Sequence, residues 1–148
     1  MTTSSQRQSG FSLIETLVTL VILAFGLLGL AGLHSVSLKN NLASQWRAQA
    51  TIYGYDIIEK MRSNCGAAHA GSYDISLSAS TPSGDGDVAT WRKGLADNLL
   101  SGKGSVLVDS GNRQAAVVIQ WDESRVSGGS STHQVQINGV LPPSIECS

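Results

Sequence analysis

The chain has 148 residues, a formal net charge of −1 at pH 7 and 14% charged residues. This length leaves room for one modest domain beside a membrane segment. The near-neutral charge gives no basic surface for nucleic acid, so we expect no nucleic-acid partner. Charged residues fall well short of the usual quarter, partly because one long stretch near the N-terminus contains almost none.

That stretch begins after a polar segment of ten residues ending in Gly10. From Thr16 to Leu33 there is no charged side chain, and only Thr16 and Thr19 are polar. Eighteen residues of helix cover about 27 Å, close to the ~30 Å hydrocarbon core of a bilayer. The composition therefore predicts a transmembrane helix over about 13–33, with the single acid Glu15 just inside its start.

A removable secretory signal is the main alternative to a retained helix. Such a signal has an apolar core of about 7–15 residues, followed by a cleavage site between small residues. Here the apolar run is longer, and Gly32–Ser35 continues into sequence compatible with a helix. We therefore expect the helix to be kept in the mature protein.

Residues 8–33 resemble a known processing signal. Gly10 followed by Phe11-Ser-Leu-Ile-Glu15 and an unbroken apolar segment is similar to the class III signal of type IV prepilins. The continuation Gly26–Leu33 further resembles the PilV-type minor pilins. The resemblance implies cleavage between Gly10 and Phe11, N-methylation of the new Phe11 amine, and an assembly role for Glu15.

The same resemblance implies an α+β fold, with a long N-terminal helix packed on a small antiparallel β-sheet head. It divides the chain into a leader (1–10), a helix (11–63, comprising the membrane segment and a spine over 34–63) and a head (64–148). The expected location is the bacterial inner membrane, with a cytoplasmic N-terminus and a periplasmic head, and afterwards the pilus. The implied partners are a prepilin peptidase and methylase, other major and minor pilins, and the inner-membrane assembly machinery.

Pilus assembly or initiation, twitching motility and adhesion are the activities that the resemblance implies. A pseudopilin of a type II secretion system carries the same N-terminal signal and is the closest alternative. A membrane-anchored adhesin or DNA-uptake module and a membrane-tethered enzyme are further alternatives.

Glu15 has a physical role independent of the resemblance. An ionised carboxylate in lipid costs a few kcal/mol, so such residues are usually paired, neutralised or functional. Cleavage after Gly10 would create a cationic amine one helical turn away, at Phe11. In a packed filament, Glu15 of one subunit could pair with the Phe11 amine of a neighbour; alternatively, Glu15 stays hydrated near the membrane surface.

The helix is predicted to continue beyond Leu33 as a spine. Apolar residues recur every three, four or seven positions, which predicts one buried stripe: Leu38, Leu42, Trp46, Tyr53, Ile57 and Met61. The opposite, solvent-facing side carries Lys39, Asn40, Gln45, Arg47, Glu59 and Arg62. Gly54 weakens the helix, and Ser63–Gly66 supplies its stop.

Residues 67–90 are poor in large apolar side chains and predict an irregular connection with one short strand at Tyr73–Leu77. Asp85-Gly-Asp87 lacks the further oxygen ligands of a calcium loop and is interpreted as a solvated turn. Trp91–Leu100 has helical spacing, and Gly102 is a suitable stop. Gly102–Ser105 resembles a phosphate loop only superficially and predicts a surface turn.

Three strands are predicted next, over 105–109, 114–121 and 133–140. Ser110–Asn112 suits a tight hairpin and Ser127–Thr132 a longer one. Asn138-Gly139 could end the last strand early.

Cys65 and Cys147 bracket the head, and one disulfide between them is the simplest interpretation; two free thiols are the alternative. Closing this loop presumes an oxidising compartment such as a bacterial periplasm. No histidine lies near either cysteine at ligand spacing, so we expect no metal site. No catalytic motif is present and no cofactor is expected; Asp122 and Glu123 adjoin a strand end without an identifiable partner.

Overall fold

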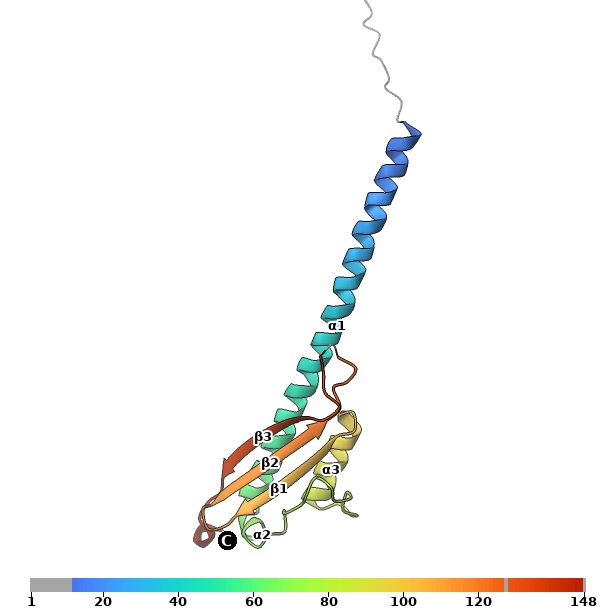
Figure 1. Cartoon of the computed structure of the whole chain (residues 1–148). Coiled ribbons are helices and arrows are strands. Elements are labelled where there is room, and N and C mark those ends of the chain that lie inside the picture. Colours follow the sequence, from blue (N-terminus) through green and yellow to red (C-terminus); the bar gives the residue numbers. More distant parts are fainter. Residues whose placement is uncertain (1–11, 127, 148) are drawn as a thin grey trace, which may run out of the picture. The chain divides into compact units, whose positions relative to one another are not determined.

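A computed structural model describes residues 12–126 and 128–147 (Figure 1). The elements in chain order are α1 (Leu13–Ser63), α2 (Cys65–His69), α3 (Asp87–Asn98), β1 (Lys103–Asp109), β2 (Gln114–Trp121), β3 (His133–Val140) and a 3₁₀ turn, η1 (Ser144–Glu146). The chain forms two compact units, residues 1–38 and 39–148. The predicted α+β architecture, a long helix with a small antiparallel sheet, is confirmed.

The helix α1 runs for 51 residues without interruption, including through Gly54. Leucine and alanine are strong helix formers, and no proline precedes Pro82. Tertiary contacts outweigh the weak propensity of Gly54, because this residue lies where the sheet comes closest to the helix. A Cβ atom at position 54 would lie 2.3 Å from Cδ1 of Ile137 on β3.

The buried face of α1 differs from the predicted stripe. Ile57 and Met61 are buried as expected, but Leu38 and Leu42 remain 64% and 47% exposed. The buried positions of α1 are Ala43, Ala50, Gly54, Ile57, Ile58 and Met61. Half of this set are small residues, which let the sheet approach the helix backbone, and the spacing of large side chains does not reveal them.

The sheet has the strand order β1-β2-β3, with both pairs antiparallel. The predicted bounds of β2 and β3 are confirmed, and β1 begins two residues earlier than predicted, at Lys103. Alternate residues of β2 are buried, which is the pattern of a strand with one face on a core. β3 continues through Asn138-Gly139 rather than ending there, since Gly139 packs against Ile58 of α1.

The structure differs from the sequence predictions in two further ways between α1 and β1. The predicted strand at Tyr73–Leu77 is reduced to one bridge between Ile75 and Val106 of β1. The predicted stop after Ser63 ends α1, but the chain forms a second short helix, α2, immediately afterwards. Both differences arise because this segment packs on the edge of the sheet instead of forming an independent strand.

The helix α3 starts at Asp87, four residues before the predicted Trp91, and ends at Asn98. Asp87 lies in its first turn, where a carboxylate interacts favourably with the helix dipole, and accepts a hydrogen bond from the buried Tyr73 hydroxyl. Burial and this hydrogen bond raise the pKa of Tyr73 to about 12. The predicted apolar spacing is confirmed, because Trp91, Leu95 and Leu99 are buried.

Gly102 and Gly104 are buried at the start of β1 instead of forming a surface turn. A Cβ on Gly102 would lie 2.1 Å from the carbonyl oxygen of Leu95, and one on Gly104 would lie 2.2 Å from the Trp91 ring. These glycines therefore allow β1 to pack directly against α3.

A disulfide joins Cys65, in α2, to Cys147, with 5.4 Å between their Cα atoms. The bond closes a loop spanning 82 positions, which contains α3 and the whole sheet. On the chain-entropy view, such a long loop stabilises the fold by about 4–5 kcal/mol.

The contact at Gly102 gives a stability prediction. Gly102→Ala should lower the free energy of unfolding by about 1–3 kcal/mol, because the new methyl group would overlap a backbone carbonyl that cannot move aside easily. Gly66→Ala is the matched control, since its Cβ would meet only Cys147 Cβ at an ordinary 3.9 Å. Thermal unfolding of the full-length protein in detergent, followed by circular dichroism, checks the difference; equal melting temperatures would contradict it.

Candidate assembly interface

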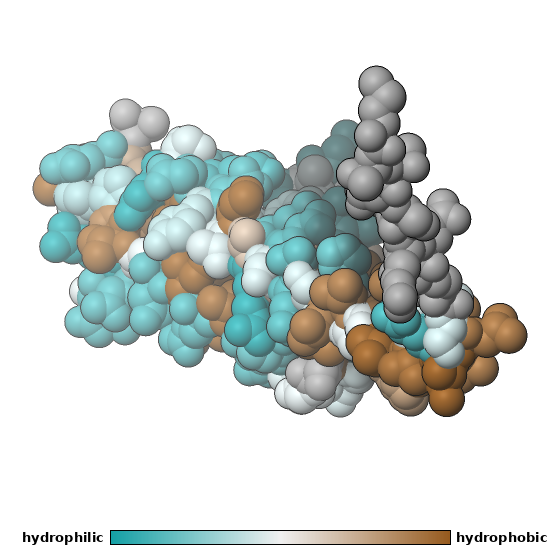
Figure 2. Space-filling model, turned by 90° about the horizontal axis from the view of Figure 1, so that it is seen from above, coloured by the Kyte–Doolittle hydropathy of each residue, from teal (hydrophilic) through white to brown (hydrophobic). Residues whose placement is uncertain are grey.

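The N-terminal half of α1 exposes a continuous apolar surface. The large apolar side chains between Leu13 and Leu33 are all exposed, and this surface appears brown in Figure 2. The helix is long and apolar enough to cross a membrane. An exposed apolar surface of this size needs lipid or other protein as its surroundings.

The two threonine hydroxyls on this segment are hydrogen-bonded within the helix. The hydroxyl of Thr19 donates to the carbonyl oxygens of Glu15 and Thr16, each at 2.8 Å. The Thr16 hydroxyl similarly approaches the carbonyl oxygen of Ser12. A hydroxyl bonded in this way costs little in an apolar environment, so the two threonines are compatible with a membrane helix.

Glu15 lies in the first turn of α1 and is exposed. In the part of the chain that the structure describes, no cation forms an ion pair with this carboxylate. The helix dipole favours an acid at this end, but it does not replace a counter-ion in lipid. The predicted cleavage and methylation sites, Gly10 and Phe11, lie outside the described residues.

Three glycines interrupt the apolar surface, at Gly26, Gly29 and Gly32. A Cβ at each of these positions would meet no atom within 4 Å, so no contact within the chain requires glycine there. Each glycine costs a helix roughly 1 kcal/mol relative to alanine. In membrane helices, small residues allow the backbone of another helix to approach closely. Packing of this kind would explain why glycine stands at these three positions.

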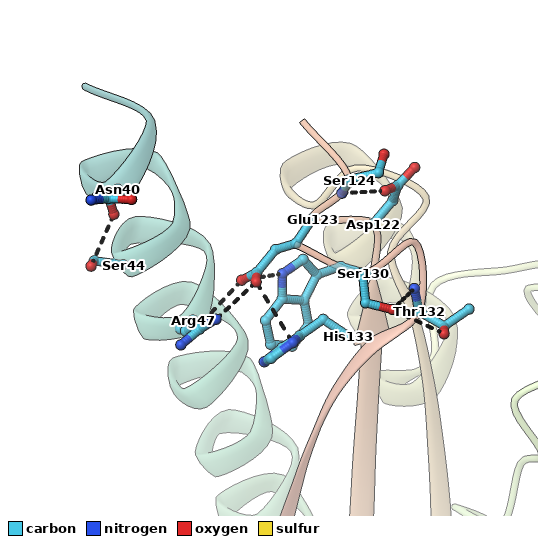
Figure 3. Close-up of polar contacts among 10 residues, drawn as sticks. Asn40, Ser44, Arg47, Asp122, Glu123, Ser124, Ser130, Thr132 and His133 are labelled. Atoms are coloured by element: carbon cyan, nitrogen blue, oxygen red, sulfur yellow. Dashed lines mark hydrogen bonds and ion pairs between the residues drawn. The ribbon is translucent and has the colours of Figure 1, made fainter. Parts of the chain in front are cut away.

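A second cluster lies in the other unit, where Arg47 of α1 meets Glu123 after β2 (Figure 3). The Arg47 Nε and Nη2 atoms donate to the two Glu123 oxygens at 3.1 and 2.9 Å. The indole Nε1 of Trp121 donates to Glu123 Oε1 at 3.1 Å, and Nδ1 of His133 lies 3.6 Å from Oε2. The Glu123 side chain is only 1% exposed, whereas that of Arg47 is 56% exposed.

This arrangement explains why a carboxylate can be buried at the strand end. The hydrogen bonds from Arg47 hold the pKa of Glu123 below its usual range despite its burial, and Trp121 adds to the effect. Sequence reasoning missed the pair: it placed Arg47 on the solvent face of the helix and found no partner for Glu123. The two residues are 76 positions apart, and no local pattern links them.

The cluster connects α1 to the loop between β2 and β3. The backbone N–H of Glu123 donates to the carbonyl oxygen of Ser130 at 2.8 Å, which closes the base of that loop. Asp122 accepts from the Ser124 N–H at 2.8 Å, and this hydrogen bonding lowers the pKa of its carboxyl group. The cluster therefore positions the loop against α1.

Within residues 12–126 and 128–147, no three side chains among His, Cys, Asp and Glu come together as a metal site. Asp85 lies in an exposed bend, as the predicted solvated turn requires, but Asp87 begins α3 and accepts the Tyr73 hydrogen bond, so the turn ends before Asp87.

Comparison with known protein families gives a match at the N-terminal segment of the chain. Residues 5–31 match a family described as the prokaryotic N-terminal methylation motif. No curated protein matches the chain, and no solved structure does. The matched segment contains Gly10, Phe11 and Glu15, and it supports a type IV pilin-like or pseudopilin-like protein. Proteins of this class are structural, and their signal implies processing by a prepilin peptidase and membrane anchoring.

The Arg47–Glu123 pair gives a pH-dependent prediction. A carboxylate with a lowered pKa in the folded protein adds stability above its ordinary pKa of about 4.3, and this stability is lost as the pH falls through the folded value. Arg47→Gln should raise the pKa of Glu123 and move acid unfolding to a higher pH.

Acid titration of the full-length protein, followed by tryptophan fluorescence, measures this shift. Lys60→Gln is the control, because the partly solvent-exposed Lys60–Asp56 pair is worth little. An unchanged midpoint for Arg47→Gln would show that the pair does not stabilise the fold.

Proposed function

We propose that this chain is a minor pilin of a type IV pilus, similar to the PilV type. The observation that carries the proposal is the methylation motif at residues 5–31, which includes most of the exposed apolar part of α1, Leu13–Leu33. An α+β head with a long helix behind its sheet agrees with this class. The protein would take part in pilus assembly or initiation, and through the pilus in twitching motility or adhesion.

Processing would define the mature protein. A prepilin peptidase removes residues 1–10 by cleaving between Gly10 and Phe11, and the new Phe11 amine is methylated. The helix 11–63 then anchors the chain in the inner membrane through about 13–33, with its N-terminus in the cytoplasm. Residues 64–148 complete a periplasmic head, whose disulfide suits an oxidising compartment.

Assembly would use Glu15 and the small residues of α1. Moving an apolar helix from lipid into a fibre exchanges lipid contacts for protein contacts, so packing and polar pairing determine its position. Glu15 of one subunit would pair with the Phe11 amine of a neighbour in the low-dielectric fibre core. A subunit placed out of register would leave both charges unpaired, which favours the correct register.

A pseudopilin of a type II secretion system is the second candidate, because the methylation motif supports both classes equally. In both candidate functions, the chain is processed by a prepilin peptidase and packs through α1 with neighbouring subunits. The two functions differ in the fibre that the chain enters, a pilus or a pseudopilus. Isolation of surface pili that contain the chain would favour the first, and dependence of secretion on the chain would favour the second.

The first prediction from this proposal concerns the mature N-terminus. Mass spectrometry of the protein from its own cells should find a chain beginning with N-methylated Phe11. Gly10→Val should block this cleavage, because the peptidase would no longer meet a small residue at the cut, and leave the leader attached. A mature chain beginning near His34 would instead show that the apolar segment is a removed signal.

The second prediction concerns Glu15. Glu15→Gln removes the charge but keeps the side-chain size, so membrane insertion should be unchanged. Incorporation into fibres should fall at least about tenfold, which corresponds to ~1.4 kcal/mol. Quantitative blots of sheared fibres and membranes measure the ratio. Glu59→Gln, on the exposed part of α1 in the head, is the control; equal incorporation of both variants would remove the role of Glu15.

A further inference from the structure

We propose that a thiol attacks Cys147 in the folded head and opens the Cys65–Cys147 disulfide, so that this bond is a redox-sensitive attachment of the C-terminal tail. The tail is defined here as residues 143–147, which include η1. The inference goes beyond the proposed function, because it concerns the head alone and holds for either kind of fibre.

The disulfide is the main attachment of the tail to the rest of the head. Within the described ranges, the hydrogen bonds of residues 143–147 join them only to one another, as between the Glu146 N–H and the Pro143 carbonyl oxygen at 2.9 Å. The nearest anchoring bond lies before the tail, where His69 Nε2 donates to the Pro142 carbonyl oxygen at 2.8 Å. All three residues of η1 are exposed, and η1 lies beside α2 (Figure 1). Breaking the disulfide would therefore free the tail, because only this packing would still hold it.

The two cysteines differ in their exposure. Cys65 is only 7% exposed, whereas Cys147 is partly exposed. Both line a cavity of about 190 Å³ between the end of α1, α2 and the tail. This volume is several times the ~30 Å³ that a water molecule occupies in the liquid, so a thiol group has room to enter. Because an attacking thiolate needs access to one of the two sulfur atoms, the difference in exposure favours attack on Cys147.

The charges around this cavity neither attract a thiolate strongly nor exclude it. One cation, Arg62, and one acid, Glu146, line the cavity, and Arg62 also pairs with Glu59. Space therefore determines access to the sulfur atoms. Gly66 contributes to this space, because it has no side chain on the wall of the cavity. A Cβ at position 66 would meet only Cys147 Cβ, at an ordinary 3.9 Å.

The exchange takes place in two steps and needs only thiols. In the first step, a thiolate sulfur forms a bond with Cys147 Sγ, the Cys65–Cys147 bond breaks, and Cys65 leaves as a thiolate that takes a proton from water. In the second step, another thiolate attacks the mixed disulfide, and Cys147 leaves and is protonated in the same way. The two cysteines are thus reduced, and the two attacking thiols are oxidised to a disulfide. The reverse sequence attaches the tail again.

Reduction of the full-length protein in detergent by reduced glutathione tests the proposal. The rate should rise with the glutathione concentration and lie within about tenfold of the rate in denaturant, because Cys147 is accessible in the folded state. A bond reached only through global unfolding would react roughly a thousandfold more slowly, or less, since so little of the chain is unfolded at equilibrium. Alkylation of the new thiols and mass spectrometry measure the rate, and the slow result would overturn the proposal.

Gly66→Leu tests whether the cavity is the route to the disulfide. The leucine side chain would fill the space beside Cys147, so reduction should become at least about tenfold slower in the folded protein and stay unchanged in denaturant. Gly66→Ala is the matched control, because it leaves most of the cavity open and should react like wild type. The melting temperature in detergent shows whether each variant is folded. Equal rates for folded Gly66→Leu and wild type would contradict the inference.

Two measurements on the wild-type chain need no variant. Samples quenched early with acid should carry glutathione on Cys147 and a free thiol on Cys65; the opposite distribution would show that attack occurs at the wrong sulfur. After complete reduction and alkylation, the near-ultraviolet circular dichroism of the buried Trp91 and Trp121 should persist, because only the tail is released. Loss of this signal would overturn the proposal, since the bond would then hold the whole head together.

Discussion

Backbone N–H and C=O groups within lipid must be hydrogen-bonded to protein, and a single membrane segment meets this requirement only as a helix, which agrees with the N-terminal half of α1. The N-terminal half has no sheet or loop to bond with, so it must be helical. The same unbroken helix continues to Ser63, where it forms one wall of the head core. One element therefore meets two different surroundings, and its side chains change accordingly. The first half exposes Leu, Ile and Val, whereas the second half buries alanine, glycine and a few large residues.

The head is built so that this helix can serve as a packing surface for a sheet of only three strands. Gly54 and Gly139 remove side chains where α1 and β3 come closest, and Gly102 does the same where β1 meets α3. On the same face of the sheet, the core is completed by Trp91 of α3, whose indole N–H donates to the carbonyl oxygen of Tyr53 of α1 at 2.9 Å. A small head with these close contacts needs few large residues, which agrees with its glycine-rich and serine-rich sequence.

The sequence predicts a helix or strand correctly where a residue pattern within that segment alone determines its structure. The alternation in residues 114–121 and 133–140 gives β2 and β3 with correct bounds, and the uncharged run after Glu15 gives the long helix. The buried face of α1 is harder, because alanine and glycine carry no hydrophobic signal strong enough to compete with Leu38 and Leu42. Close packing at these positions becomes visible only when the partner strand is known.

At the candidate interface, too, a contiguous motif can be predicted from the sequence, whereas contacts between residues far apart in the sequence cannot. The processing motif is contiguous, so the sequence identifies it directly. The Arg47–Glu123 pair and the cavity beside the disulfide depend on residues that the fold brings together from distant positions. An exposed arginine on a helix and an acid after a strand are common, and neither suggests a partner by itself. Only the buried position of Glu123 indicates that its charge needs a partner.

The disulfide has a consequence for how the head is made. Cys65 follows α1 directly, but Cys147 follows every strand of the sheet. A chain synthesised from its N-terminus and threaded across a membrane would deliver the first thiol long before the second. The anchor and spine would thus be in place while the sheet is still emerging, and oxidation would be the final covalent event. With only two cysteines among the 148 residues, the chain has a single possible internal pairing.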